Sequence, residues 1–159
     1  MKLEKWNEKA AGMLDKLCAT STRFMYASVD NGVVFTDTKG HYALFCDNCT
    51  VVSVHDTKEQ SDYLRKYWKQ FEHSKHELAQ DIVSGKFRDE KGMKIVKLSR
   101  DGMDVYLDRK YYNLFPKNTL FYTESPTSAV LAGIWENDRL HLIGLVLPVR
   151  LGDKVFEAA

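Results

Sequence analysis

The sequence predicts an α+β fold in which a mostly antiparallel sheet is packed against helices. Runs of neighbouring strand-like segments, separated by tight turns, alternate with segments whose apolar residues recur every three or four positions. Strands that follow one another through short turns pair antiparallel, and helices with one apolar face must cover such a sheet. The 159 residues are enough for one domain around one hydrophobic core.

The composition is that of a globular protein, with 44% hydrophobic residues and a formal charge of +1. The balanced charge excludes a global field that attracts polyanions. The charged N-terminus does not resemble a secretory signal, and the longest apolar run, residues 142–149, is short of the ~20 residues that span a bilayer. Three cysteines do not suggest a disulfide framework. We therefore expect a cytoplasmic protein that has free thiols and does not insert into membranes.

The first third of the chain predicts a helix followed by an antiparallel meander. Residues 2–19 place apolar side chains at helical spacing with charged residues between them. Asn31-Gly32 supplies the positive backbone dihedrals of a tight hairpin turn. The expected strands are residues 24–29, 33–36, 41–45 and 50–54.

The middle of the chain predicts a long helix. Thr57 and Gln60 form a capping box, and one apolar stripe continues to Ile82 before Gly85. A second capping box at Ser74 and Glu77 would divide the segment into two helices with a bend. A polar connection, residues 86–92, follows.

The last third predicts strands around one short helix. Asp108 caps a helix of residues 109–115, which Pro116 ends, and residues 136–138 form the turn between the last two strands. The expected strands are residues 94–98, 103–107, 119–122, 128–135 and 140–147.

Several of these segments together resemble a domain of the bacterial DNA sliding clamp, the polymerase III beta subunit. The first helix and Arg23-Phe-Met-Tyr-Ala-Ser-Val-Asp-Asn-Gly-Val-Val-Phe-Thr-Asp37 are similar to its first helix and hairpin. Met103-Asp-Val-Tyr-Leu-Asp-Arg-Lys-Tyr-Tyr-Asn-Leu-Phe115 is similar to its second strand-to-helix unit. Tyr122-Thr-Glu-Ser-Pro-Thr-Ser-Ala-Val130 and Gly144-Leu-Val-Leu-Pro-Val-Arg-Leu151 are similar to the final strands of the last clamp domain, which ends in a comparable Pro-x-Arg-hydrophobic tail.

The resemblance implies a clamp-like fold and a non-enzymatic role. It also suggests that a phage is the source of the protein. One domain would occupy residues 1–159, with residues 56–92 as a helical insertion, and a ring around DNA would require a homo-oligomer. In the family the segment matching residues 145–151 lines a shallow apolar pocket that captures short peptides from polymerases and other partners. The corresponding partner-binding residues are Leu147, Pro148, Val149 and Arg150. The residues alone also allow a simpler interpretation, in which Leu145 and Leu147 face the core and Pro148 ends an edge strand.

Two further groups of residues suggest other ligands. Cys46 and Cys49 have the spacing of a zinc half-site, and His73 and His76 would complete a tetrahedral set. The same cysteines could instead form a redox pair or pack as small apolar groups in a turn. On the long helix, a basic face opposite the apolar stripe could follow a phosphate backbone or be an ordinary solvated face. It consists of Arg65, Lys66, Lys69, His73 and His76.

The sequence contains no Gly-rich phosphate loop, nucleophile elbow or zinc-protease motif. The first hypothesis is therefore a non-enzymatic protein with a clamp-like domain, without a cofactor, that binds a protein partner or the DNA replication machinery. The second is a nucleic-acid-binding protein that uses the basic helix face, and the third is a small zinc-binding protein.

Overall fold

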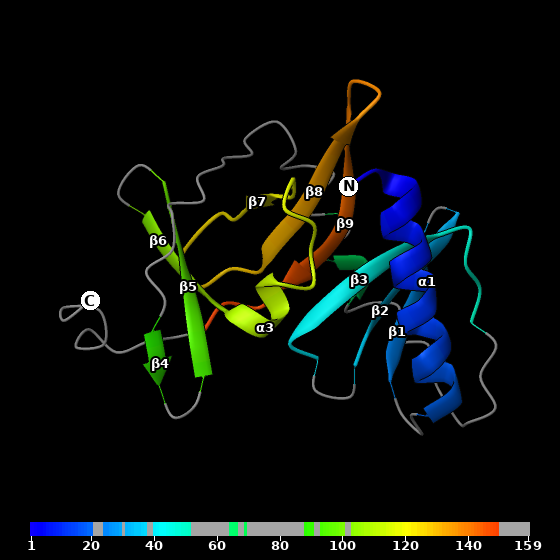
Figure 1. Cartoon of the computed structure of the whole chain (residues 1–159), viewed down its shortest axis with the longest axis horizontal. Helices are drawn as coiled ribbons and strands as arrows, with labels where there is room; N and C mark the ends of the chain where they lie inside the picture. Colours follow the sequence, from blue (N-terminus) through cyan, green and yellow to red (C-terminus); the bar gives the residue numbers. More distant parts are fainter. Residues whose placement is uncertain are drawn as a thin grey trace.

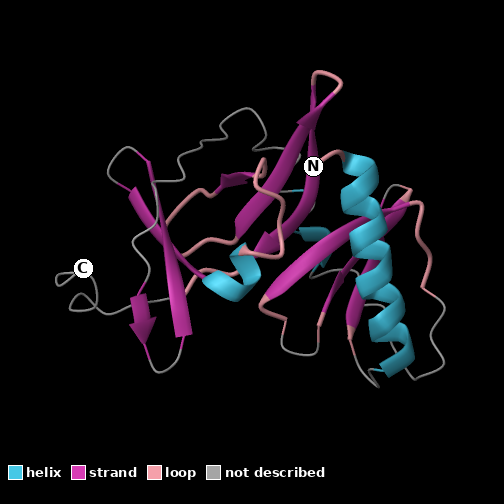
Figure 2. Cartoon of the chain, viewed as in Figure 1, coloured by secondary structure: helices cyan, strands magenta, loops and turns pink. Residues whose placement is uncertain are grey.

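A computed structural model describes residues 1–20, 24–29, 31–37, 40–51, 64–66, 69, 88–90, 93–100 and 103–149. In these residues the α+β prediction is confirmed: two antiparallel sheets are packed against helices (Figures 1 and 2). Residues 73 and 76, residue 150 and most of the expected insertion at residues 56–92 lie outside the described residues.

Sheet A has the strand order β1-β2-β3-β9-β8-β7, and every neighbouring pair is antiparallel. Its strands are β1 (Met25–Val29), β2 (Gly32–Thr36), β3 (Tyr42–Asp47), β7 (Leu120–Tyr122), β8 (Val130–Glu136) and β9 (Arg139–Val146). Sheet B has the order β4-β5-β6 and is also antiparallel. Its strands are β4 (Arg88–Glu90), β5 (Met93–Arg100) and β6 (Met103–Asp108).

Helix α1 (Leu3–Thr20) buries one face against sheet A. Its buried residues recur every four positions, as the sequence predicts: Trp6, Ala10, Leu14 and Cys18. The short helix α3 (Arg109–Tyr112) begins at the expected cap, where the Asp108 carboxylate accepts a hydrogen bond from the Lys110 amide at 3.0 Å. It ends three residues earlier than predicted, because residues 113–115 continue as turns.

The fold consists of two similar units that meet at the middle of sheet A. Each unit is a helix followed by three antiparallel strands: α1 with β1, β2 and β3, then α3 with β7, β8 and β9. In each unit the first strand lies at an edge of the sheet and the last strand lies at its centre, where β3 pairs with β9 (Figure 1). The two halves of the sheet are therefore related by an approximate twofold arrangement.

Both faces of sheet A are buried. Val33 belongs to one apolar cluster and Val34 to another, as expected for side chains that alternate across a strand. The first cluster joins α1, α3 and sheet B to one face of sheet A. The second cluster, on the opposite face, includes Leu64, which is buried against residues of β1, β2, β3, β8 and β9. Residues 64–66 and 69 are helical, within the predicted long helix.

Three local predictions need correction. The expected polar connection at residues 86–92 contains a strand, because Arg88–Glu90 pairs with residues 93–95 of β5. Its charged sequence is typical of edge strands, where charge discourages pairing with other chains. Thr50 and Val51 are not in a strand, and the place beside β3 is taken by β9 instead. Gly32 lies in β2 opposite Val29 without a positive φ, so it does not act as the predicted turn residue.

Two glycines are required by close packing between strands. A Cβ on Gly32 would meet the carbonyl oxygen of Cys46 and lie 2.8 Å from the Phe45 ring. A Cβ on Gly144 would lie 2.6 Å from the carbonyl oxygen of Ala43 and 2.7 Å from the Phe115 ring. Gly144 therefore allows β3, β9 and the chain after α3 to approach one another.

Substituting Gly144→Ala should destabilise the protein by roughly 1–3 kcal/mol, because the added methyl group must displace backbone and an aromatic ring. Urea denaturation followed by circular dichroism measures this change. Gly12→Ala is the control: nothing lies within 4 Å of its Cβ position, and alanine is the better helix former. A Gly144→Ala protein as stable as wild type would contradict the close approach of β3 and β9.

Candidate functional site

The residues after β9 connect the two sheets. The Leu147 amide donates a hydrogen bond to the carbonyl oxygen of His41 at 2.9 Å, next to β3 in sheet A. Two residues later, the Val149 amide donates to the carbonyl oxygen of Tyr106 at 2.8 Å, on β6 of sheet B. Pro148 has no amide hydrogen, and it stands between these two donors. The tail, residues 147–149, therefore crosses from one sheet to the other.

The tail residues are neither buried nor fully exposed. Leu145 faces the second cluster and is buried, as the simpler interpretation of this segment predicts. Leu147, Pro148 and Val149 are each half-buried. Strand β9 is central rather than an edge strand, so Pro148 does not end an edge strand as that interpretation assumed. Arg150, the fourth expected partner-binding residue, lies outside the described part of the chain.

Aromatic and basic side chains lie close to this crossing. His41 is exposed, and its Nδ1 lies 3.2 Å from the Tyr111 hydroxyl. The Tyr111 ring packs on Tyr42 with centroids 5.1 Å apart, and the Lys110 ammonium lies 4.8 Å from the centroid of the Tyr111 ring. We call this region the junction. It consists of the tail together with His41, Tyr42, Tyr106, Lys110 and Tyr111.

Burial raises the pKa of one tyrosine in the junction and of one tyrosine beside it. Burial raises the pKa of Tyr42 to about 12, and the charges of Asp37 and Tyr111 act in the same direction. Burial also raises the pKa of Tyr112, whose ring stacks on Phe121 with centroids 5.3 Å apart. At neutral pH these tyrosines are uncharged and can donate or accept hydrogen bonds. The junction therefore combines apolar surface and neutral hydroxyl groups with the positive charge of Lys110.

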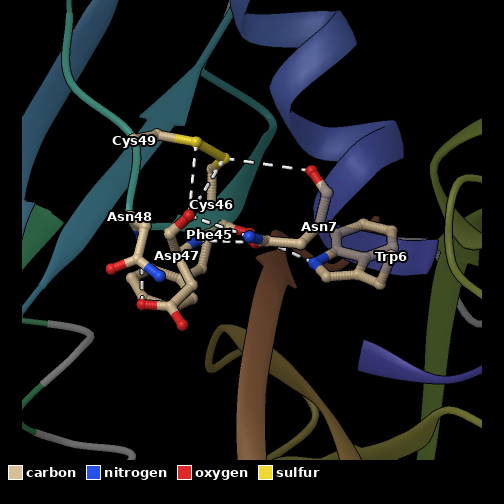
Figure 3. Close-up of a disulfide and its surroundings, with 7 residues drawn as sticks. All are labelled: Trp6, Asn7, Phe45, Cys46, Asp47, Asn48 and Cys49. Atoms are coloured by element: carbon tan, nitrogen blue, oxygen red, sulfur yellow. Dashed lines mark hydrogen bonds between the residues drawn. A yellow bond between two sulfur atoms is a disulfide. The ribbon is translucent and has the colours of Figure 1, made fainter. Parts of the chain in front are cut away.

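The cysteines expected as free thiols are joined in the structure. Cys46 and Cys49 form a disulfide at the end of β3 (Figure 3). A disulfide provides no thiolate for zinc, so this state does not hold the predicted metal, and His73 and His76 lie outside the described residues. The parts of the chain that the structure covers contain no group of three or more potential metal ligands. The zinc site therefore stays an untested prediction.

One residue of the basic helix face, Arg65, is bound to sheet A. The Arg65 guanidinium donates two hydrogen bonds, at 3.1 and 2.9 Å, to the carbonyl oxygen of Ser28 on the edge strand β1. Arg65 is half-buried, whereas Lys66 and Lys69 are exposed. Arg65 thus covers part of the open edge of sheet A, and the two lysines are the described residues of this face that point to solvent.

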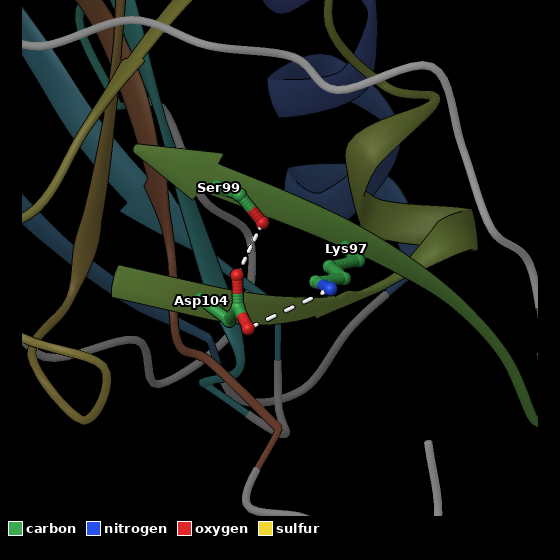
Figure 4. A network of polar contacts seen from close by, with 3 residues as sticks. All are labelled: Lys97, Ser99 and Asp104. Carbon is green, nitrogen blue, oxygen red and sulfur yellow. Dashed lines mark hydrogen bonds and ion pairs between the residues drawn. The ribbon is translucent and has the colours of Figure 1, made fainter. Parts of the chain in front are cut away.

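A polar cluster lies on sheet B but does not form a catalytic arrangement. The Ser99 hydroxyl donates a hydrogen bond to one oxygen of Asp104, and the Lys97 ammonium lies 3.5 Å from the other (Figure 4). Ser99 and Asp104 are directly opposite each other on β5 and β6. The hydrogen bond and the ion pair to Asp104 stabilise this strand pair. The three residues include no histidine, which is the base of a Ser-His-Asp triad.

The sequence did not identify most of the junction. His41, Tyr106 and Tyr111 come from three different segments, and no local motif connects them.

The sequence also did not identify Trp135 as a surface residue. It is 55% exposed on the β8–β9 hairpin, whose tip residues Asn137 and Asp138 have positive φ angles of 54° and 58°. These dihedrals confirm the predicted turn, since paired positive φ angles are typical of two-residue hairpin loops.

Comparison of the chain with protein-family models, with curated proteins and with solved structures found no match in any of the three. Within the described residues, no helix combines the length and the apolar character needed to cross a membrane.

The raised pKa of Tyr42 predicts a loss of stability in alkaline solution. The phenol ionises near pH 10 in the unfolded chain but near pH 12 in the folded protein. The folded state therefore binds more protons in this window, and its stability falls as the pH rises from 10 to 12. Urea midpoints measured across this window should decline in wild type and decline less in Tyr42→Phe. The control Tyr26→Phe, on β1, should keep the wild-type decline, and a Tyr42→Phe curve parallel to wild type would contradict the assignment.

Proposed function

We propose that this protein is a non-enzymatic binding protein with a sliding-clamp-like domain, which holds a short peptide from a protein partner or from the DNA replication machinery. The observation that carries the proposal is the half-buried tail, residues 147–149, whose backbone is held by both sheets. It is the segment that the clamp resemblance identifies with a peptide pocket. We place the protein in the cytoplasm, where the replication machinery works.

The arrangement of the two units supports a clamp-like domain. The resemblance concerned a first helix with its hairpin and a second strand-to-helix unit. The first of these segments forms α1, β1 and β2, in one half of sheet A. The second forms β6 of sheet B and then α3, which leads into β7 in the other half of sheet A. The last two segments of the resemblance connect β7 to β8 and include the end of β9, which all belong to the same second unit.

The junction offers a peptide two kinds of contact. Aliphatic side chains of a peptide would pack against Leu147 and Val149, which keep part of their apolar surface in water. Exposed Lys110 would attract a carboxylate on the same peptide. Both sheets hold the tail before any partner arrives, so the tail itself loses little conformational entropy when a peptide binds.

The test is binding of labelled peptides that correspond to the C-terminal segments of bacterial replicative DNA polymerases. Fluorescence anisotropy should show saturable binding to the full-length protein with a Kd on the order of micromolar, as is usual for a short peptide on a shallow site. Leu147→Asp should weaken binding by about tenfold or more, because it places a charge on the apolar contact.

Glu8→Gln, on the exposed side of α1, is the matched control and should bind like wild type. Circular dichroism of each variant separates loss of binding from loss of folding. If no such peptide binds, or if folded Leu147→Asp binds as well as wild type, the proposal is wrong.

Nucleic-acid binding is the second candidate, favoured by the exposure of Lys66 and Lys69, which are both helical. The Arg65 guanidinium already donates two hydrogen bonds to the carbonyl oxygen of Ser28. We therefore expect this face to bind DNA weakly. Filter binding at low and moderate salt should therefore show little salt-sensitive retention. Strong retention at low salt that disappears in the Lys66→Glu/Lys69→Glu double variant would favour this candidate over peptide binding.

A further inference from the structure

The disulfide lies at a corner where β3, α1 and the β1–β2 hairpin meet. Cys46 is in β3 and is completely buried, whereas Cys49, two residues beyond the strand, is half-buried. Their Cα atoms are 5.7 Å apart, within the range that a disulfide bridges. The two sulfur atoms therefore differ in their access to solvent.

Hydrogen bonds that do not involve sulfur hold this corner in place (Figure 3). The Asn7 side chain donates to the carbonyl oxygen of Asp47 at 2.8 Å and accepts from the Asp47 amide at 2.6 Å. The Trp6 indole donates to the carbonyl oxygen of Phe45 at 3.1 Å. The Asn48 amide donates to the carbonyl oxygen of Asn31 at 2.8 Å, and Asn48 has a φ of 55°. Hydrogen bonds to α1 and to the β1–β2 hairpin thus fix the turn after β3, and this conformation does not require the sulfur–sulfur bond.

Acceptors for two thiols are also present. The Cys49 sulfur lies 3.4 Å from the carbonyl oxygen of Asp47. The Cys46 sulfur lies 3.8 Å from the same oxygen and 4.0 Å from the carbonyl oxygen of Asn7. If the disulfide opens, each S–H group has a backbone carbonyl within hydrogen-bonding range, so the reduced state leaves no buried donor without an acceptor.

We propose that Cys46 and Cys49 form a reversible redox pair that undergoes thiol–disulfide exchange with a low-molecular-weight thiol of the glutathione class. A thiolate attacks the more accessible sulfur, that of Cys49, and forms a mixed disulfide while Cys46 leaves and takes up a proton. A second thiolate then attacks the sulfur of the bound thiol, which releases Cys49 and one molecule of oxidised thiol. Two thiols are oxidised and one protein disulfide is reduced. Cytosolic disulfides are usually of this transient kind, which agrees with the expected location.

The test is to equilibrate the native full-length protein in glutathione buffers from fully reducing to fully oxidising. Samples are quenched in acid, unfolded, alkylated and weighed by mass spectrometry. The chain has three cysteines, of which two form the pair. The alkylated number should fall from three to one as the buffer becomes oxidising and should return to three on reversal. In Cys18→Ala, which removes the third cysteine, it should fall from two to zero.

Two single variants test the order of attack. In Cys46→Ser the remaining Cys49 should form a mixed disulfide with glutathione, whereas in Cys49→Ser the buried Cys46 should form it about tenfold more slowly or not at all. Equal rates in the two variants would overturn the entry through Cys49. The proposal fails if all three cysteines are alkylated after every buffer, if the pair resists reduction in the native protein, or if the disulfide involves Cys18.

Discussion

The antiparallel pairing of β3 with β9 is the interaction on which the rest of the structure depends. It joins Tyr42 to Val146, Ala43 to Leu145 and Leu44 to Gly144, and it is the direct strand pairing between the two halves of sheet A. The paired segments are about a hundred residues apart, so the entropy of closing this loop must be recovered from burial on both faces. Gly144 makes the pairing possible, because a side chain there would meet both the backbone of β3 and the ring of Phe115.

Burial on the two faces accounts for the stability of this pairing. On one face Trp6 stacks on Phe115 with centroids 5.6 Å apart, which connects α1 of the first unit to the chain after α3 of the second. Phe115 in turn contacts Phe121 of β7 edge to face, with centroids 5.8 Å apart. On the other face Leu145 and Ala43 are buried in the cluster that includes Leu64. Aromatic pairs of this kind contribute beyond their buried area, so the two units are joined by packing as well as by backbone hydrogen bonds.

The position of the candidate site follows from the same pairing. Because β9 is central, its C-terminal end emerges between the two sheets, and the tail can bond to His41 on one side and Tyr106 on the other. An edge strand would have placed the tail at the border of the sheet.

Strand β9 contains a bulge. Ala132 pairs with Gly144 and Gly133 with Leu142, so Ile143 is an extra residue without a partner position on β8. This extra residue changes which β9 side chains face each cluster, so that Leu142 and Leu145 share one face while Ile143 and Val146 share the other.

The sequence by itself determined the elements whose signals are local. The four-residue spacing of Trp6, Ala10 and Leu14, the cap at Asp108 and the turn at Asn137 all act within a few residues, and the structure contains each of them. Only the tertiary structure decided what lies beside what: β9 rather than residues 50–54 next to β3, Arg65 on the edge of β1, and Cys46 bonded to Cys49. These outcomes could not be predicted because they depend on the free energy of packing distant segments together. A short stretch of sequence contains only one of the two segments that make each such contact.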